Sequence, residues 1–260
     1  MSKIIAIANE KGGTGKTTSS VNLGAGLQRQ GKRVLLCDND PQGNLTTSLG
    51  FEPEQLTKTL SDLMLEKIKD DNCTFNKSEY ILEKEGLHIL PSDIRLSAVD
   101  NSLVNALSRE YILRDILNEY RSDFDYILID CLPSLGMLTI NALAAADSLI
   151  IPVQAQFLSL KGLELLLNTV SRVRRQINRS LSIDGILLTM YNSRTNLSRE
   201  VKKAVEDSYG SSIRIFSSVI SYSVKAAEPT VYGESIFTHD PNGAIAGAYL
   251  DVVKEMLCNE

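Results

Sequence analysis

An eight-residue segment, Lys11-Gly12-Gly13-Thr14-Gly15-Lys16-Thr17-Thr18, decides how this chain is expected to fold. It follows an apolar run of strand length, Ile4–Ala8, and opens a helical pattern, Thr17–Gln30. A phosphate-binding loop requires this order of strand, glycine-rich turn and helix. The glycines let backbone N–H groups approach phosphate oxygens, and the start of the helix adds its dipole. The segment therefore predicts a P-loop in which Lys16 contacts the β- and γ-phosphates and Thr17 ligates Mg²⁺.

Apolar runs of strand length alternate with helical patterns along the rest of the chain, which is typical of βαβ units. Most runs are continuous Ile, Leu and Val stretches, as expected for strands covered on both faces. The predicted strands are Ile4–Ala8, Arg33–Cys37, Leu87–Leu90, Tyr126–Asp130, Ser148–Pro152 and Ile183–Met190. The predicted helices are Thr17–Gln30, Ala98–Tyr120, Leu158–Asn178, Ser198–Tyr209 and Ala244–Leu257, with short helices and loops over Phe51–Glu85. We expect one α/β domain of the P-loop NTPase class over residues 1–260, with a mostly parallel twisted sheet and helices on both faces.

The composition argues against several classes of protein. Hydrophobic residues make up 43% of the chain and charged residues 23%, so a large core can form and disorder is not expected. The net charge of −5 excludes a protein that is basic throughout, although a local basic patch is compatible with it. The four cysteines form no CxxC pair, which argues against a disulfide framework, a zinc ribbon or an iron–sulfur site and suits a reducing cytosol. No apolar stretch approaches the roughly 20 residues needed to cross a bilayer, and the N-terminus lacks a signal-peptide layout.

Two acidic segments follow predicted strands. Asp38 and Asp40 come just past the carboxyl end of Arg33–Cys37, where α/β sheets bind ligands. A carboxylate near phosphates needs a cation or a proton-transfer role, because it otherwise repels the ligand. The run Tyr126–Ile129 ends at Asp130, a Walker B pattern that predicts a carboxylate near Mg²⁺. The alternative for Asp38 and Asp40 is a role as helix-cap or turn residues.

The P-loop resembles the deviant Walker A motif of the ParA/MinD family of ATPases. Glu10 stands where the ordinary motif has its first glycine, and Lys11 adds a second lysine at the loop entrance. The resemblance implies that Lys11 reaches across a dimer interface to the partner's nucleotide; the alternative is a solvated surface lysine. Asp38–Asn44 resembles the family's D-x-D-P-Q-G-N switch motif. That resemblance implies that Asp40 positions or activates the attacking water and that Asp38 organises the water shell of the metal.

The resemblance extends along nearly the whole chain. Gly185–Leu197 is similar to the strand and RTNL loop of the ParA (Soj) partitioning branch. Two positions depart from the family, because Leu132 replaces the first of two prolines and Ser221-Tyr222 replaces a Pro-Arg pair. The implied nucleotide contacts are Lys11, Gly12, Gly13, Thr14, Gly15, Lys16, Thr17 and Thr18, with Asn192 and Pro229 as candidates for adenine. The implied catalytic residues are Lys11, Lys16 and Asp40, and the implied metal-site residues are Thr17, Asp38, Asp40 and Asp130.

Basic residues gather in the carboxyl-terminal half. The stretch Lys161–Lys225 holds eleven Lys and Arg against five Asp and Glu, a net charge of +6 in a chain that is acidic overall. Such asymmetry suggests a face that binds a polyanion. The resemblance implies contacts with DNA phosphates without sequence preference. The candidate DNA-binding residues are Arg194, Arg199, Lys202, Lys203 and Lys225, and the alternative is a solvated helix surface.

The resemblance implies a cytoplasmic, nucleoid-associated partitioning ATPase. ATP and Mg²⁺ would drive formation of a sandwich homodimer that binds nonspecific double-stranded DNA, and a ParB-like partner would stimulate hydrolysis and release. One alternative is a MinD-like membrane-positioning ATPase, which the short and acidic segment Leu250–Glu260 disfavours. A second alternative is a regulatory binding protein switched by ATP. An iron–sulfur carrier lacks its CxxC spacing, and a GTPase lacks its Asn-Lys-x-Asp motif.

Overall fold

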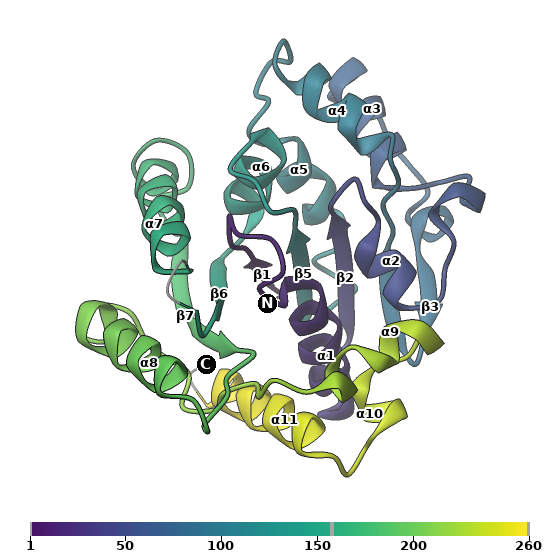
Figure 1. Ribbon diagram of the computed structural model, residues 1–260. Helices are drawn as coiled ribbons and strands as arrows, with labels where there is room; N and C mark the ends of the chain where they lie inside the picture. Colours follow the sequence, from purple (N-terminus) through teal and green to yellow (C-terminus); the bar gives the residue numbers. More distant parts are fainter. Residues whose placement is uncertain (1, 157–158, 259–260) are drawn as a thin grey trace.

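The computed structural model describes residues 2–156 and 159–258, and it contains a seven-stranded sheet with helices on both faces (Figure 1). The strand order is β3-β4-β2-β5-β1-β6-β7. Strand β3 runs antiparallel to β4, and the other neighbouring strands pair in parallel. The strands are β1 (Lys3–Ile7), β2 (Val34–Asn39), β3 (Leu82–Lys84), β4 (Leu87–Leu90), β5 (Tyr126–Cys131), β6 (Ser148–Gln154) and β7 (Ser182–Thr189). The predicted α/β P-loop NTPase fold with a mostly parallel sheet is therefore confirmed.

The central strands are apolar on both sides because helices cover both faces of the sheet. Adjacent residues of one strand enter different cores: Ile4 belongs to one hydrophobic cluster and Ile5 to the other, and both are fully buried. One core lies under α3 to α8, and the other lies under α1, α10 and α11. A sheet buried in this way presents its functional side chains at the strand ends rather than on its faces.

The helices fall into these two layers. Those along the first half of the chain are α1 (Lys16–Arg29), α2 (Asn44–Ser48), α3 (Leu60–Lys69), α4 (Leu96–Leu103) and α5 (Ile112–Asn118). The later helices are α6 (Met137–Ala145), α7 (Ser159–Gln176), α8 (Asn196–Tyr209), α9 (Glu228–Tyr232), α10 (Ile236–His239) and α11 (Ala244–Leu257). Three 3₁₀ turns complete the chain: η1 (Pro53–Gln55), η2 (Lys77–Tyr80) and η3 (Val224–Ala226). The structure agrees with the prediction for Ala244–Leu257 to the residue and with Leu158–Asn178 to within two residues, although Leu158 itself lies outside the described residues.

The prediction of one long helix over Ala98–Tyr120 is wrong. The chain breaks this stretch into α4 and α5, separated by residues 104–111. Side chains supply hydrogen bonds in place of the helical ladder: Arg109 Nη1 donates to the Val104 carbonyl at 2.8 Å, and Asn141 Nδ2 donates to the Arg109 carbonyl at 2.8 Å. Asn141 Oδ1 then accepts the Leu113 N–H at 3.1 Å, near the start of α5. Tertiary contacts from α6 have thus overridden the local helical pattern.

The edge strand β3 was not predicted either. It pairs with β4 through a tight turn at Glu85 and Gly86, whose φ angles are 54° and 73°. Two consecutive residues with positive φ are the requirement of a two-residue type I′ hairpin turn. The Glu-Gly pair between the short apolar segments was the signal that could have revealed this hairpin.

Candidate active site

The carboxyl ends of β1, β2 and β5 bring the predicted phosphate loop and both acidic segments to one edge of the sheet. Asp38 and Asp130 occupy paired positions on β2 and β5. Strand β1 lies on the other side of β5 and leads directly into the loop. Residues separated by more than a hundred positions in the sequence therefore surround one small volume.

The phosphate loop has the backbone that its glycines permit. Gly13 and Gly15 adopt φ angles of 71° and 80°, in the left-handed region that favours glycine. Helix α1 begins immediately afterwards, at Lys16. The loop is also anchored from outside, because the Thr189 hydroxyl at the end of β7 donates to the Thr14 carbonyl at 2.7 Å. This anchoring holds the turn in place with its N–H groups at the start of a helix, an arrangement suited to an anion.

Lys16 is a buried cation within this loop. Its side chain belongs to a residue that is only 7% exposed, and its Nζ donates to the Lys11 carbonyl at 3.1 Å. Burial lowers the pKa of Lys16, and the nearby carboxylates of Asp130 and Asp40 act in the opposite direction. An ammonium has three donors, and the carbonyl takes one of them. A phosphate group would supply both the compensating charge and further acceptors.

Oxygen atoms suited to Mg²⁺ lie beside this lysine. The Thr17 hydroxyl donates to Asp130 Oδ2 at 2.7 Å, and the Ser20 hydroxyl donates to Asp130 Oδ1 at 2.9 Å. Hydroxyl and carboxylate oxygens are ligands that Mg²⁺ prefers, commonly together with phosphate oxygens and water. The residues present therefore fit a Mg²⁺–nucleotide complex. Ser20 is a contact that the sequence alone did not reveal.

The two acidic residues after β2 have different surroundings. Asp38 is fully buried, and its carboxylate accepts the Thr46 N–H at 2.9 Å, the Thr46 hydroxyl at 2.7 Å and the Asp40 N–H at 3.3 Å. These bonds tie the segment after β2 to helix α2. Asp40 is 6% exposed, accepts the Gln42 N–H at 2.9 Å and lines the phosphate cavity. The structure thus gives Asp38 a role in holding the loop and puts Asp40 at the cavity wall.

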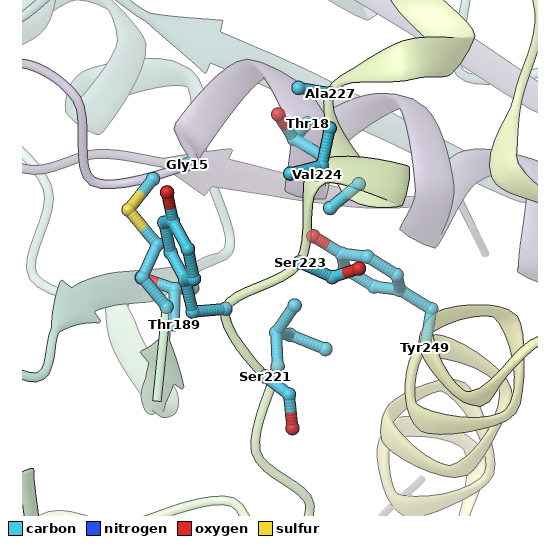
Figure 2. A pocket seen from close by; sticks show the side chains of 12 residues that line it. Gly15, Thr18, Thr189, Ser221, Ser223, Val224, Ala227 and Tyr249 are labelled. Carbon is cyan, nitrogen blue, oxygen red and sulfur yellow. The ribbon is translucent and has the colours of Figure 1, made fainter. Parts of the chain in front are cut away.

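Two cavities adjoin at this edge of the sheet. The first is about 260 Å³ and is formed by the phosphate loop together with Asp40, Asn44, Pro133 and Met190. The second is about 330 Å³ and shares Gly15, Thr18 and Met190 with the first. Its other lining residues, several of which are labelled in Figure 2, are Thr189, Ile220, Ser221, Tyr222, Ser223, Val224, Ala226, Ala227 and Tyr249. A polar cavity continued by a largely apolar one has the chemistry to hold a phosphate chain and a flat base.

Asn192 and Pro229, the two candidates for adenine contacts, line neither of these cavities. Asn192 Oδ1 instead accepts the Arg194 N–H at 3.1 Å, and Pro229 is buried in the first turn of α9. The apolar cavity is built by Met190 and by the segment Ser221–Ala227, which includes the family departure at Tyr222. The sequence did not reveal this because the wall comes from a loop without a regular pattern.

Lys11 lies at the mouth of the loop but is not among the residues lining the phosphate cavity. Its Nζ donates to Gln154 Oε1 at 3.1 Å and to Gln156 Oε1 at 3.3 Å, at and just beyond the end of β6. The two lysines of the loop therefore point to different places: Lys16 into the turn of its own chain, and Lys11 toward β6.

Burial of two carboxylates side by side changes their protonation. Burial and the neighbouring Asp130 raise the pKa of Asp38 to about 7, against the hydrogen bonds from Thr46. Burial likewise raises the pKa of Asp130 to about 6, although Thr17, Ser20 and Lys16 act in the opposite direction. In the metal-free protein this edge of the sheet therefore takes up protons near neutral pH.

This protonation predicts a pH-dependent effect of Asp130→Asn. The unfolded carboxyl loses its proton near pH 4 and the folded one near pH 6, so the free energy of unfolding contributed by Asp130 falls as the pH rises through that window. We expect Asp130→Asn, which does not titrate, to gain stability relative to the wild type by about 1 to 2 kcal/mol between pH 5 and pH 8. Urea unfolding in EDTA at both pH values measures this, and an equal difference at the two values would contradict it.

The candidate DNA-binding residues lie on connected surface segments beyond β7. Arg194, Arg199 and Lys203 are exposed in the loop after β7 and on α8, and Lys202 is half-buried and pairs with Glu206 at 3.8 Å. Lys225 is exposed in η3 and pairs with Asp240 at 2.9 Å. A β-bridge between Tyr191 and Ser221 makes the two segments start side by side. Helices α7 and α8 lie at the same side of the molecule, next to β7 (Figure 1).

Comparison with known proteins was made against families, curated sequences and solved structures. A family model described as an AAA domain matches residues 2–183. The sporulation initiation inhibitor protein Soj of Bacillus subtilis is 44% identical over 263 aligned residues, covering 100% of both chains. The chromosome partitioning protein ParA of Caulobacter vibrioides is 39% identical over 99% of this chain and 95% of its own. A Mycobacterium smegmatis structure named cobyrinic acid a,c-diamide synthase, with bound ATP analogue and magnesium, is similar with a TM-score of 0.85 and 34% identity, over 99% of this chain and 95% of that one.

Proposed function

Because this chain belongs to the ParA/MinD family of P-loop ATPases, in its Soj and ParA partitioning branch, we propose that ATP joins two copies of it into a dimer that binds DNA and separates after hydrolysis. The chain is a partitioning ATPase that uses ATP and Mg²⁺. The observation that carries the proposal is the position of Lys11, which sits at the loop mouth with its ammonium directed to β6 rather than among the residues of the phosphate cavity. Such an ammonium is placed to serve a triphosphate other than its own.

The site residues divide the work of hydrolysis. Lys16 and the loop N–H groups bind the phosphates, and Thr17 and Asp130 hold the metal and its water shell. Mg²⁺, when bound, neutralises charge that develops on the phosphate oxygens. Asp40 orients the attacking water from the cavity wall, while Asp38 and Thr46 hold the loop that carries it. The apolar cavity takes the purine base, with Met190 and Tyr222 in its wall.

The first test of this proposal is Lys11→Ala. The variant keeps Lys16, Thr17 and Asp130, so we expect its ATP affinity to stay within about threefold of the wild type. It loses the ammonium that would bind the partner's triphosphate, and charge-assisted hydrogen bonds contribute about 1.5–3 kcal/mol each. We therefore expect the dimer dissociation constant, measured by sedimentation with a nonhydrolysable ATP analogue, to rise at least about tenfold.

Lys254→Ala provides the matched control, because Lys254 is an exposed lysine on α11 that pairs with Asp251 at 2.9 Å. Its removal should leave dimer formation unchanged. Normal ATP-dependent pairing of the Lys11→Ala variant would contradict the role across the dimer.

DNA binding is proposed for the basic segments that carry Arg194, Arg199 and Lys203. Phosphate contacts are independent of sequence and release counterions, so each one adds to the salt dependence of binding. We expect Arg194→Ala to weaken binding to all duplex sequences alike and to reduce the slope of log affinity against log salt by about one. Fluorescence anisotropy over a salt series with the ATP analogue measures both quantities.

Arg33→Ala is the control for this measurement. Arg33 lies at the opposite edge of the sheet, before β2, where it pairs with Asp125 at 2.9 Å. An unchanged salt slope for Arg194→Ala, or an equal change for the control, would remove Arg194 from the DNA interface.

A MinD-like membrane role is less well supported. In MinD-like proteins the last helix is amphipathic and available to lipid, whereas α11 buries Ile245, Tyr249, Val252 and Val253 against the core and packs on α1. Among the described residues, no helix has both the length and the apolar character to cross a bilayer. We propose instead a cytoplasmic, nucleoid-associated protein whose hydrolysis is stimulated by a ParB-like partner. DNA affinity compared in ADP and in the ATP analogue separates this from a regulatory module that does not use DNA.

A further inference from the structure

The entrance lysine is held by its own chain at the end of β6. Lys11 Nζ lies 3.1 Å from Gln154 Oε1 and 3.3 Å from Gln156 Oε1. A lysine ammonium has donors and no acceptor, so the amide oxygen of Gln154 is the atom that can face it. Both of these acceptors are neutral amides rather than carboxylates.

A second contact fixes the orientation of the Gln154 amide. Its Nε2 donates to the Met190 sulfur, a weak acceptor, at 3.3 Å. With the amino group turned to Met190, the carbonyl oxygen faces Lys11. Met190 itself is held by the fold, because it follows β7 directly with a φ angle of 50°, an uncommon backbone conformation for a residue that is not glycine.

Met190 also connects this arrangement to the nucleotide site, since it lines both the phosphate cavity and the apolar cavity. The contacts thus run in one chain from the cavity wall, through Gln154, to the ammonium of Lys11. The wall, the amide and the ammonium come from β7, β6 and the phosphate loop, which the sheet fixes relative to one another.

We propose that Gln154 is a positioning residue for Lys11: it holds the ammonium on its own chain before pairing and releases it to the partner's triphosphate. This inference rests on the proposed function. A neutral amide oxygen satisfies the ammonium when no phosphate is near, but it is a weaker acceptor than a charged phosphate oxygen. Glutamine at this position therefore sets how readily the ATP-bound chain pairs.

Two substitutions of Gln154 test the proposal because they change the hold in opposite directions. Gln154→Glu converts a neutral acceptor into a carboxylate, which should retain Lys11 and raise the dimer dissociation constant about tenfold in the ATP analogue. Gln154→Leu removes the acceptor and should lower that constant about threefold. Sedimentation equilibrium at saturating Mg²⁺ and analogue measures both. The effect of Gln154→Glu should also shrink at high salt, because it depends on charge.

Gln30 offers the matched control, since it is exposed at the far end of α1 and its substitution by Glu or Leu changes charge and shape equally. Damage to the fold would weaken pairing in both Gln154 variants and would lower nucleotide affinity, which we expect to stay within about twofold. Shifts in the same direction, or no shift in either variant while the wild type pairs normally, would overturn this inference alone. A wild type that stays monomeric with the analogue would overturn the proposed function and this inference with it.

Discussion

Lys16→Ala is expected to reduce the affinity for ATP and ADP by about a thousandfold, the largest change that a single substitution should produce in this protein. Lys16 is buried in the turn that forms the phosphate cavity, next to Asp130 and Asp40. Two charge-assisted hydrogen bonds to phosphate, at about 1.5–3 kcal/mol each, correspond to two or more orders of magnitude in affinity. The negative charges of Asp130 and Asp40 would also face the phosphates without this ammonium between them.

The loss should be specific to binding rather than to folding. Burial lowers the pKa of Lys16, which means that the folded protein holds this charge at a cost in free energy when no ligand is present. Removing the ammonium should therefore change the free energy of unfolding of the nucleotide-free protein by less than about 1 kcal/mol. Titration calorimetry with Mg-ADP and urea unfolding of the same sample separate the two effects. Retention of tight binding would refute the assignment of the phosphate loop.

The central part of the fold and site could be predicted because it depends on short-range patterns. Continuous apolar runs that end in Asp38 or Asp130 specify buried parallel strands, and parallel strands bring their carboxyl ends to one edge. The Gly-Lys-Thr turn between a strand and a helix specifies the loop conformation through its glycines. For these residues, sequence, backbone geometry and position in the sheet all agree.

The remainder depended on contacts between distant residues, which no local pattern records. Asn141 interrupts the expected helix over Ala98–Tyr120 from another element. The apolar cavity joins Met190 to the irregular segment Ser221–Ala227, so its wall could not be read from periodicity. Gln154 lies 143 positions after Lys11, and its importance appears only when the two side chains meet. Such pairs are outside the reach of motif analysis because neither residue is unusual on its own.

Asp40→Ala is expected to lower the rate of ATP hydrolysis at least about a hundredfold while leaving ATP binding and ATP-dependent pairing intact. General acid–base assistance contributes typically 10²–10⁴ in rate, and Asp40 is the carboxylate in the wall of the phosphate cavity after β2. Its burial at 6% exposure keeps bulk water from replacing it freely. Single-turnover hydrolysis and sedimentation of the same ATP-bound sample test the separation of chemistry from pairing.

Asp40→Asn and Gln42→Ala distinguish the chemistry of Asp40 from its effect on the loop. The asparagine oxygen can still accept the Gln42 N–H, now at 2.9 Å from Asp40 Oδ1, so the loop conformation should persist while the capacity to take a proton or orient water is lost. The exposed Gln42 side chain can be removed without touching that backbone N–H, so Gln42→Ala should hydrolyse ATP within about threefold of the wild type. Hydrolysis by Asp40→Asn at the wild-type rate would mean that Asp40 acts only on the shape of the loop, and the water-positioning role would then have to belong to another residue of the cavity.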